Sequence, residues 1–265
     1  LPCCGFIQGF CQVAERAGVS PSTVSRILNG TAKVSETKMA RVQKAIQDLN
    51  FLPDPAARSL AGGRAMSVGV LTQFIDSPFY GEALRGIEDV LLTHSFAPLF
   101  VSGHWNEQEE NSRIQMLLQR KVDGVIVLTG KLKDATLVQM SKSLPVVVTG
   151  RQLIKPNIFS IDFDNQEGVC LAMRHLHSLG HRRIAFISGP LDHADAEQRL
   201  QGYRAELSRL EIKFDSKLVL DSDFSETGGY RATSQLIQSG TDFSALIAAN
   251  DQMAYGARLA LYRAG

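Results

Sequence analysis

Short hydroxyl side chains and a guanidinium group recur within one stretch near the start of the chain, residues 13–30, with the sequence VAERAGVSPSTVSRILNG. Such groups donate and accept hydrogen bonds, which suits them to the base edges and phosphate oxygens of a DNA major groove. The residues that could make these contacts are Ser20, Pro21, Ser22, Thr23, Ser25, Arg26 and Asn29. Their types and close spacing predict a nucleic-acid-binding surface.

The elements that would position these side chains can be predicted from the same stretch. Small apolar residues between Val13 and Ala17 give a first short helix a flat apolar face, and Gly18 then tolerates a left-handed turn at low cost. Ser20 is placed to cap a second helix, whose first residue, Pro21, occupies a position that needs no N–H donor. This pattern predicts a helix-turn-helix.

The predicted second helix has two distinct sides. Val24, Ile27 and Leu28 follow the spacing of a buried face, so the hydroxyls and Arg26 point outward. A third helix can begin after a cap at Ser35, and its apolar residues at helical spacing are Met39, Val42, Ala45, Ile46 and Leu49. The first 50 residues therefore predict a three-helix bundle, although the bare pattern equally fits a small helical hairpin with no role in DNA binding.

Residues 53–63, PDPAARSLAGG, predict a short hinge after this bundle. A helix start signal, one or two helical turns and a glycine stop follow one another within the segment. We therefore place a hinge at residues 51–64.

The helix-turn-helix stretch, the VSE that opens the third helix and the AARSLAGG of the hinge resemble the lactose/galactose repressor (LacI/GalR) family of transcriptional regulators. The resemblance covers nearly the whole chain. In that family the second helix enters the major groove, and a hinge leucine wedges into the minor groove and bends the DNA. The resemblance assigns the groove role to Ser22, Thr23, Arg26 and Asn29, and the hinge role to Ala57, Arg58 and Leu60.

The composition fits a globular protein with a basic head. The chain has 265 residues, of which 44% are hydrophobic and 21% charged. Residues 1–64 hold eight Lys or Arg against four Asp or Glu, whereas residues 65–265 hold 20 against 23, which suits a head that meets a polyanion. The four cysteines form no disulfide framework, and no apolar run is long enough to span a membrane, so we expect a reduced, cytoplasmic protein.

From residue 67 onward, short runs of Val, Ile and Leu alternate with helical patterns, which predicts doubly wound parallel sheets. The first expected strands are 67–72, 98–101, 124–128 and 145–149, with helices near 78–93, 107–120 and 134–140. The alternation then repeats, with strands at 158–161, 184–188, 218–220 and 245–248 and helices at 166–179, 197–210, 228–239 and 252–263.

We therefore expect an all-α helix-turn-helix domain at 1–50, the hinge at 51–64, and two α/β lobes of periplasmic-binding-protein type at 65–160 and 161–265. The family's chain continues beyond the helix that ends near residue 264, so the second lobe is expected to be incomplete.

Open α/β sheets bind ligands beyond the carboxyl ends of their strands, and two facing lobes would bring such edges to one cleft. Carboxylates, amides, arginines and aromatics at these positions suit a polyhydroxylated ring. The candidate ligand residues are Phe79, Thr129, Arg151, Asp164, Arg199, Asn250 and Asp251. The resemblance favours Arg199, Asn250 and Asp251, which align with effector-contacting positions of the family. The stretches DAEQRLQGY and WNEQEE are most similar to the galactose-repressor branch, which favours a sugar or glycoside over a purine.

Most of these residues have a structural alternative. Asp164 can cap the helix that follows it, and Asp251 can stabilise the start of the last helix through the helix dipole. Phe79 and its neighbour Tyr80 can belong to the core, and Arg151 can pair with a carboxylate of its own lobe. Three histidines, His175, His177 and His181, resemble a metal cluster, but residues two apart on a helix face away from each other.

The motifs argue against an enzyme. The chain has no nucleophile elbow, phosphate-binding loop, dinucleotide fingerprint or zinc-protease helix, so we expect no catalytic residue, metal or cofactor. We predict a homodimeric DNA-binding regulator, a repressor, whose affinity for operator DNA is modulated by a small sugar or glycoside bound between the lobes. The alternative is a sugar sensor or carrier without effective DNA binding, which the basic helix-turn-helix head argues against.

Overall fold

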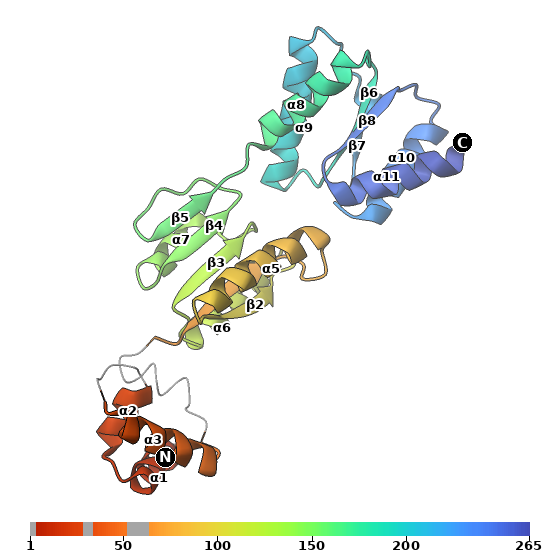
Figure 1. Cartoon of the computed structure of the whole chain (residues 1–265). Helices are drawn as coiled ribbons and strands as arrows, with labels where there is room; N and C mark the ends of the chain where they lie inside the picture. The colour runs from red at the N-terminus through yellow and green to blue at the C-terminus, as the bar shows by residue number, and fades with distance from the viewer. Residues whose placement is uncertain (1–3, 29–33, 52–63) are drawn as a thin grey trace. The chain divides into compact units, whose positions relative to one another are not determined.

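The computed structural model describes residues 4–28, 34–51 and 64–265, and it divides into two compact units, Leu1–Ile161 and Asp162–Gly265. The first contains a helical head and a five-stranded sheet, and the second contains a three-stranded sheet (Figure 1). No helix within the described ranges is both long and apolar enough to cross a membrane.

The head consists of α1 (Cys4–Ala17), α2 (Pro21–Leu28) and α3 (Glu36–Asp48). Its core is formed by buried small and β-branched residues from all three helices: Val13, Ala14, Ala17, Val24, Val42 and Ala45. Gly18 adopts the left-handed conformation expected of the turn, with a φ of 63°. The predicted three-helix bundle is confirmed.

The two predicted helix caps of the head differ. Ser20 precedes α2, and its hydroxyl accepts a hydrogen bond from the backbone N–H of Thr23 at 3.3 Å. Ser35 precedes α3, but its hydroxyl lies 3.2 Å from the Thr37 hydroxyl and makes no side-chain cap to the backbone. Only Ser20 therefore caps its helix in the way that the sequence predicts.

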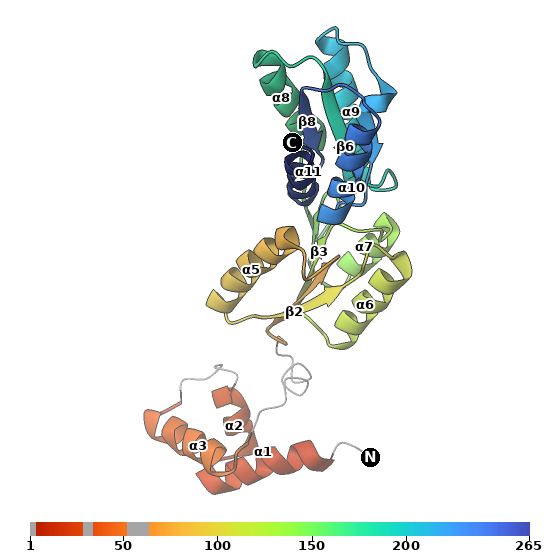
Figure 2. The same ribbon diagram turned by 90° about the vertical axis from the view of Figure 1, so that its right-hand side faces the viewer.

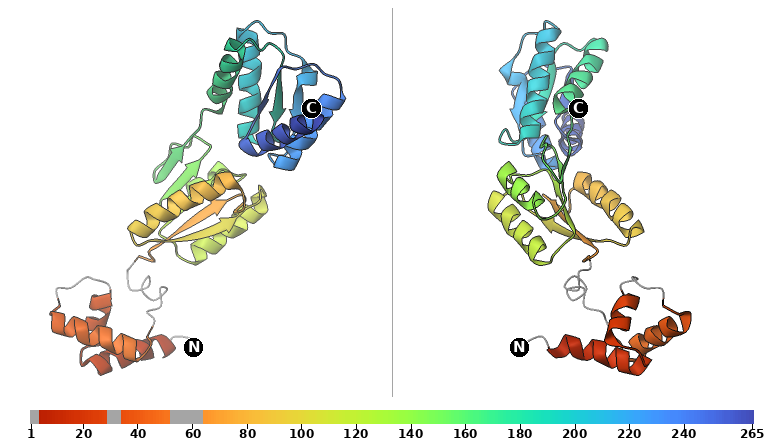
Figure 3. Two further views of the ribbon diagram at one scale, coloured as in Figure 1. Left: turned by 45° about the vertical axis from the view of Figure 1, so that its right-hand side comes forward. Right: turned by 90° about the vertical axis from the view of Figure 1, so that its left-hand side faces the viewer.

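The first sheet contains β1 (Ser67–Thr72), β2 (Ala97–Ser102), β3 (Gly124–Leu128), β4 (Val146–Thr149) and β5 (Ile158–Ile161). All neighbours are parallel, in the order β2-β1-β3-β4-β5. Helix α5 (Pro78–Thr93) covers one face, and α6 (Glu107–Gln119) and α7 (Asp134–Ser141) cover the other (Figures 2 and 3). The strands are short and rich in β-branched residues, and helices cover both faces of the sheet, as in a doubly wound fold.

One expected strand lies in a different sheet from the one predicted. The alternation of strands and helices places residues 158–161 at the start of the second repeat, although the expected lobe bounds leave residues 158–160 in the first lobe. The strand β5 pairs with β4 at the edge of the first sheet, from Val146 opposite Ile158 to Thr149 opposite Ile161. The connecting segment, residues 150–157, forms no helix. It is nevertheless long enough to run from the end of β4 back to the start of a parallel β5, because β4 has only four residues. The alternation of strands and helices therefore misplaces this strand, because a crossover without a helix interrupts it.

The second sheet contains β6 (Ile184–Ser188), β7 (Val219–Asp221) and β8 (Ala245–Ala248) in the order β7-β6-β8, all parallel. The 3-10 helix η1 (Ser216–Leu218) leads into β7. The helices are α8 (Asn165–Ser178), α9 (Ala194–Arg209), α10 (Glu226–Gln238) and α11 (Asp251–Ala264). The predicted class, a helical head followed by parallel-sheet α/β lobes, is confirmed.

Helices cover both faces of the second sheet. Tyr203 of α9 stacks on Phe186 of β6, with ring centroids 5.0 Å apart, whereas Leu236 of α10 packs against the adjacent strand residue, Ala185. Because successive residues of a strand point to opposite faces, α9 and α10 lie on opposite sides of the sheet. Helices α10 and α11 approach closely, since a Cβ on Gly256 would clash with the backbone carbonyl of Glu226.

Candidate functional site

The outward face of α2 carries the side chains predicted to contact DNA. Ser22 and Arg26 are exposed, Thr23 and Ser25 are partly exposed, and Val24 is fully buried against the head core. The burial of Val24 therefore determines which side of the helix presents its hydroxyls and guanidinium group to a partner.

The hydroxyls at the start of α2 form a connected group. The Ser20 hydroxyl lies 2.9 Å from the hydroxyls of both Ser22 and Thr23, in addition to its cap on the Thr23 backbone, and Pro21 is exposed beside them. A helix N-terminus with exposed hydroxyls suits a phosphate oxygen, since donors and the positive end of the helix dipole coincide there. Four of the predicted DNA contacts, Asn29, Ala57, Arg58 and Leu60, lie outside the described residues.

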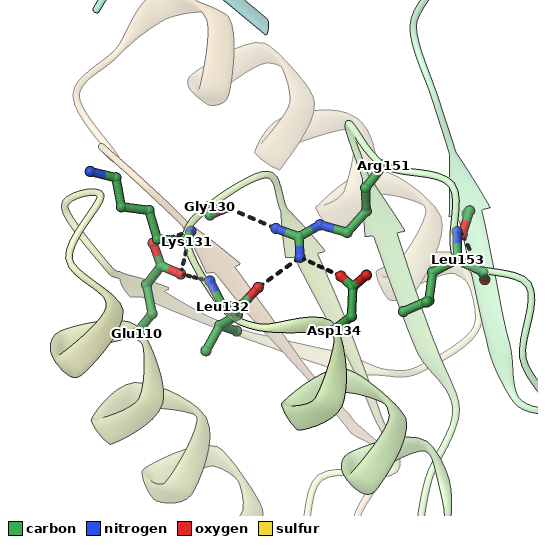
Figure 4. A network of polar contacts seen from close by, with 8 residues as sticks. Glu110, Gly130, Lys131, Leu132, Asp134, Arg151 and Leu153 are labelled. Carbon is green, nitrogen blue, oxygen red and sulfur yellow. Dashed lines mark hydrogen bonds and ion pairs between the residues drawn. The ribbon is translucent and has the colours of Figure 1, made fainter. Parts of the chain in front are cut away.

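At the carboxyl edge of the first sheet, Arg151 follows β4 and reaches the loop after β3, residues 129–132, called here the 129–132 loop. Its guanidinium group donates to the carbonyls of Gly130 and Leu132, both at 2.7 Å, and contacts the Asp134 carboxylate at 3.1 Å (Figure 4). Pairing with a carboxylate of its own lobe, the structural alternative, is therefore observed. Arg151 also holds the loop, so its position is well defined at this edge.

Glu110 holds the same loop from the other side. It is fully buried, and its carboxylate accepts the backbone N–H groups of Lys131, at 2.9 Å, and Leu132, at 2.8 Å (Figure 4). Burial raises the pKa of Glu110 above its ordinary value, although these hydrogen bonds and the charge of Arg151 oppose the shift. Glu110 was not among the residues predicted from the sequence. Its spacing from Ile114 and Leu117, four and seven positions later, is the signal that places it on the buried face of α6.

Thr129 lies at the centre of the edge in a left-handed backbone conformation, with a φ of 47°. Its N–H donates to the Thr149 hydroxyl at 3.1 Å, its carbonyl accepts from the Gln73 side chain at 3.0 Å, and its hydroxyl lies 3.0 Å from the Tyr80 hydroxyl. Tyr80 is buried, as the core alternative predicts, whereas Phe79 is 64% exposed and meets the Tyr80 ring edge-on. Phe79 therefore remains accessible at this edge.

In the second unit, Arg199 of α9 connects two other elements at the carboxyl edge of the sheet. Its Nε donates to the Asn165 side-chain oxygen at 2.9 Å, and its Nη1 donates to the Ala249 carbonyl at 2.5 Å. These contacts join the start of α8 to the end of β8. One turn earlier on α9, Asp195 has a pKa raised by burial, which the charge of Arg199 opposes.

The remaining predicted ligand residues of this unit lie at helix N-termini. Asp164 caps α8 by accepting the Glu167 N–H at 2.8 Å, so the capping alternative is observed. Asn250 caps α11 through the Met253 N–H at 2.9 Å, and its amide donates to the Phe224 carbonyl at 2.8 Å. Asp251, in the first turn of α11, is exposed. The fold thus brings Arg199 and Asn250 to one edge of this sheet and holds both by hydrogen bonds.

No group of three or more His, Cys, Asp or Glu side chains converges among the residues that the structure describes. Of the three clustered histidines, His181 lies after α8, and its Nδ1 is 3.0 Å from the Ser244 hydroxyl.

The chain matches two family descriptions that together span most of its length. Residues 11–54 match bacterial regulatory proteins of the lacI family, and residues 65–265 match the periplasmic binding proteins and sugar binding domain of the LacI family. The ribose operon repressor of Escherichia coli K12 is 34% identical over 254 residues, which cover 95% of this chain and 77% of the repressor. The transcriptional regulator GalR of the same strain is also 34% identical, over 92% of this chain and 72% of GalR.

Solved structures show the same fold. The lac repressor dimer bound to operator and an anti-inducer aligns with a TM-score of 0.82 and 29% identity, over 96% of this chain and 77% of that chain. The transcriptional regulator CelR in complex with cellobiose aligns with a TM-score of 0.65 and 32% identity, over 97% of this chain and 78% of that chain. These relatives are transcriptional regulators rather than enzymes. Because both parts of the chain match this family and its curated relatives align over nearly the whole chain, the protein belongs to the LacI family of bacterial regulatory proteins.

Proposed function

We propose that this protein is a cytoplasmic repressor that binds operator DNA through residues 1–50, with a hinge at 51–64, and whose affinity for that DNA is modulated by a sugar or glycoside. The effector is bound by the lobes at 65–160 and 161–265 together. A homodimer would carry two heads and would therefore bind a near-palindromic site with half-sites about one helical turn apart. The dimeric, operator-bound structure of the lac repressor, which shares the fold, supports this arrangement.

One observation carries the DNA-binding part: the exposed side of α2, opposite the buried Val24, presents Ser22 and Arg26. We assign the major-groove contacts to the outward residues of α2 and its cap, namely Ser20, Pro21, Ser22, Thr23, Ser25, Arg26 and Asn29, and the hinge contacts to Ala57, Arg58 and Leu60. An arginine with this exposure can bind a guanine through two hydrogen bonds, which gives it a role in reading sequence as well as in affinity.

The effector part rests on polar groups held at the carboxyl edges of the two sheets. We assign ligand contacts to Phe79, Thr129, Arg151, Asp164, Arg199, Asn250 and Asp251. A ring with several hydroxyls suits this set, because arginine and amide groups bind vicinal hydroxyls and Phe79 offers an exposed apolar face. The names of the relatives include ribose and cellobiose, which supports a sugar or glycoside for this chain. The ribose operon repressor and GalR are equally similar to it, so we propose the class and not the individual sugar.

The test is selection from a library of DNA duplexes by the whole protein, at fixed salt, with and without a panel of sugars that includes ribose and cellobiose. A palindrome whose binding changes in the presence of one sugar supports the proposal. Sugar binding without any selected DNA supports the alternative, a sensor or carrier.

Two substitutions separate the two parts of the proposal. Arg26→Ala is expected to weaken binding to the selected site by about 1–3 kcal/mol and to leave non-specific binding nearly unchanged. Arg199→Ala is expected to leave operator binding intact and to abolish the response to the sugar. Equal losses on specific and random DNA would contradict a base-reading role for Arg26, and an unchanged sugar titration would remove Arg199 from the site.

A further inference from the structure

Side chains from four other elements or loops hold the 129–132 loop. Glu110 accepts the two N–H groups in its second half, at 2.8 and 2.9 Å, and Arg151 donates to two of its carbonyls. Gln73 donates to a third carbonyl, and the Thr149 hydroxyl accepts the first N–H. Side chains therefore satisfy most of the backbone N–H and C=O groups of the loop, and its conformation depends on their identity.

The side chains on one flank of the loop are packed without spare room. A Cβ on Gly130 would lie 2.6 Å from the Gln73 amide nitrogen and 2.8 Å from a Glu110 carboxylate oxygen, and a Cβ on Gly103 would clash with Glu110. Gln73 is fully buried, as Glu110 is, and its oxygen accepts the backbone N–H of Trp105 at 2.7 Å. Glu110 and Gln73 thus form a tightly fitted support beneath the loop.

This support lies directly behind two proposed ligand residues. Thr129 is the first residue of the loop, and the Arg151 guanidinium group donates to the loop carbonyls of Gly130 and Leu132 (Figure 4). Thr129 and Gly130 both have positive φ angles, 47° and 138°, so the loop has a conformation that regular secondary structure does not maintain. A change in the support would therefore move Thr129 and Arg151 together.

We propose that Glu110 and Gln73 are positioning residues, which hold the 129–132 loop in the conformation that binds the effector at the first sheet. This inference rests on the proposed function, because it requires an effector at this edge. Neither residue needs to touch the effector. Their role is to orient Thr129 and Arg151 before the effector arrives, so that its binding does not have to order the loop.

The chemistry explains why a carboxylate occupies this position. Two N–H groups converge on Glu110, and a carboxylate offers them two acceptor oxygens. Both N–H groups reach Oε2, and the Lys131 N–H also lies 3.0 Å from Oε1. In Glu110→Gln the amide oxygen at the Oε2 position would still accept from both, but the NH2 group at the Oε1 position would then point a donor at the Lys131 N–H. A buried donor without an acceptor is costly, so the loop is expected to leave its present conformation.

The experiment compares the whole wild-type protein with E110Q and, as a matched control, E206Q. Glu206 is an equally buried carboxylate on α9 of the second unit, so the same substitution there reports general destabilisation. Hydrogen exchange of peptides covering residues 129–134 measures the loop directly. Binding of ribose, cellobiose and further sugars is followed by calorimetry and by the emission of Trp105, the single tryptophan of the chain.

We expect E110Q to speed exchange in the loop and to weaken binding of the responsive sugar about tenfold, while E206Q changes neither. Equal effects of the two substitutions, or unchanged exchange in E110Q, would overturn the inference. If E110Q does not fold, Q73M removes the donor to Thr129 and is expected to give the same pattern.

The two proposals can fail separately. If no sugar binds even the wild-type protein, the proposed effector class fails. Hydrogen exchange then decides the positioning role: faster exchange confined to the loop of E110Q supports it, and unchanged exchange contradicts it.

Discussion

Among the residues that the structure describes, each of the two units buries one glutamate, and the two are stabilised in opposite ways. Glu110 of the first unit is surrounded by backbone N–H donors, and burial raises its pKa. Glu206 of the second unit accepts hydrogen bonds from Arg209 at 2.7 Å and Arg174 at 3.2 Å, and these bonds hold its pKa below the ordinary value in spite of burial. The donors around Glu110 thus do not offset its desolvation in full, whereas two cations more than offset it for Glu206.

The difference follows from what each carboxylate holds. The partners of Glu110 are backbone N–H groups of the loop, which are fixed in place. If the Glu110 carboxylate is removed, these donors cannot reorient to bind water instead. Glu206 joins α8 to α9 through arginines that are 39% and 55% exposed. These arginines can reach water if the carboxylate is lost. The burial of a carboxylate therefore does not by itself determine its contribution to stability. Whether its hydrogen-bond partners can bind water after the carboxylate is lost matters as much.

The largest effect is expected for Glu110→Leu. The substitution removes both acceptor oxygens and leaves the N–H groups of Lys131 and Leu132 unpaired, so we expect a loss of about 3 kcal/mol in the stability of the first unit. Urea unfolding at neutral pH, followed by Trp105 emission, measures it. Glu88→Leu, at an exposed position of α5, is the control. A loss no greater than that of the control would break the comparison.

A smaller loss is expected for Glu206→Leu. Because Arg174 and Arg209 regain water, we expect about 1–2 kcal/mol in the second unit. Hydrogen exchange of peptides from α8 and α9 measures it without reference to the first unit. A loss equal to that of Glu110→Leu would show that the exposure of the partners does not matter.

The two glutamates are also expected to respond to pH with opposite signs. The folded pKa of Glu206 is lowered, so its stabilising contribution is present above the unfolded pKa and is lost as the pH falls through the folded pKa. The folded pKa of Glu110 is raised, so its contribution is full below the unfolded pKa and is lost as the pH rises through the folded pKa.

The measurement is the stability difference between wild type and each Glu→Gln variant, taken between about pH 4 and pH 7, a range that spans the ordinary glutamate pKa. On acidification the difference should grow for Glu110 and shrink for Glu206. Parallel slopes would mean that the two sites share one electrostatic environment.

The smallest effect is expected for Glu167→Gln, which sharpens the comparison within one network. Glu167 binds the same arginine, Arg174, at 2.8 Å, but both side chains are substantially exposed. An exposed pair of this kind contributes little, so the change in unfolding free energy should stay within about 0.5 kcal/mol. A loss similar to that of Glu206→Leu would indicate that Arg174 depends on both carboxylates.

Most elements of the fold could be predicted from local patterns. Strands β1 and β3 have the predicted bounds, and α2 shows Val24 buried opposite Arg26, because side-chain periodicity reports directly which face is covered. The sheet to which β5 belongs could not be predicted in this way. Pairing between parallel strands depends on how the intervening chain crosses the sheet, and no local pattern records that path.

The candidate site divides along the same line. The positions of Thr129 and Asn250 directly after strands followed from the chain order, since the ligand edge of an open α/β sheet can be predicted from its topology. Which alternative a candidate residue adopts did not follow from the sequence. A helix cap for Asp164 and an ion pair within its lobe for Arg151 were among the alternatives, and only the distances establish that both form and that Arg151 also binds the loop carbonyls.

The sequence by itself determined the helix-turn-helix head, the alternation of strands and helices and the family, because local residue spacing and motifs indicate each of these directly. Only the tertiary structure decided that β5 closes the first sheet and that Glu110 supports the 129–132 loop while Glu206 joins two helices. The physical reason is that a buried carboxylate takes its properties from partners that lie far away in the chain. Those partners are backbone N–H groups in one unit and arginines in the other.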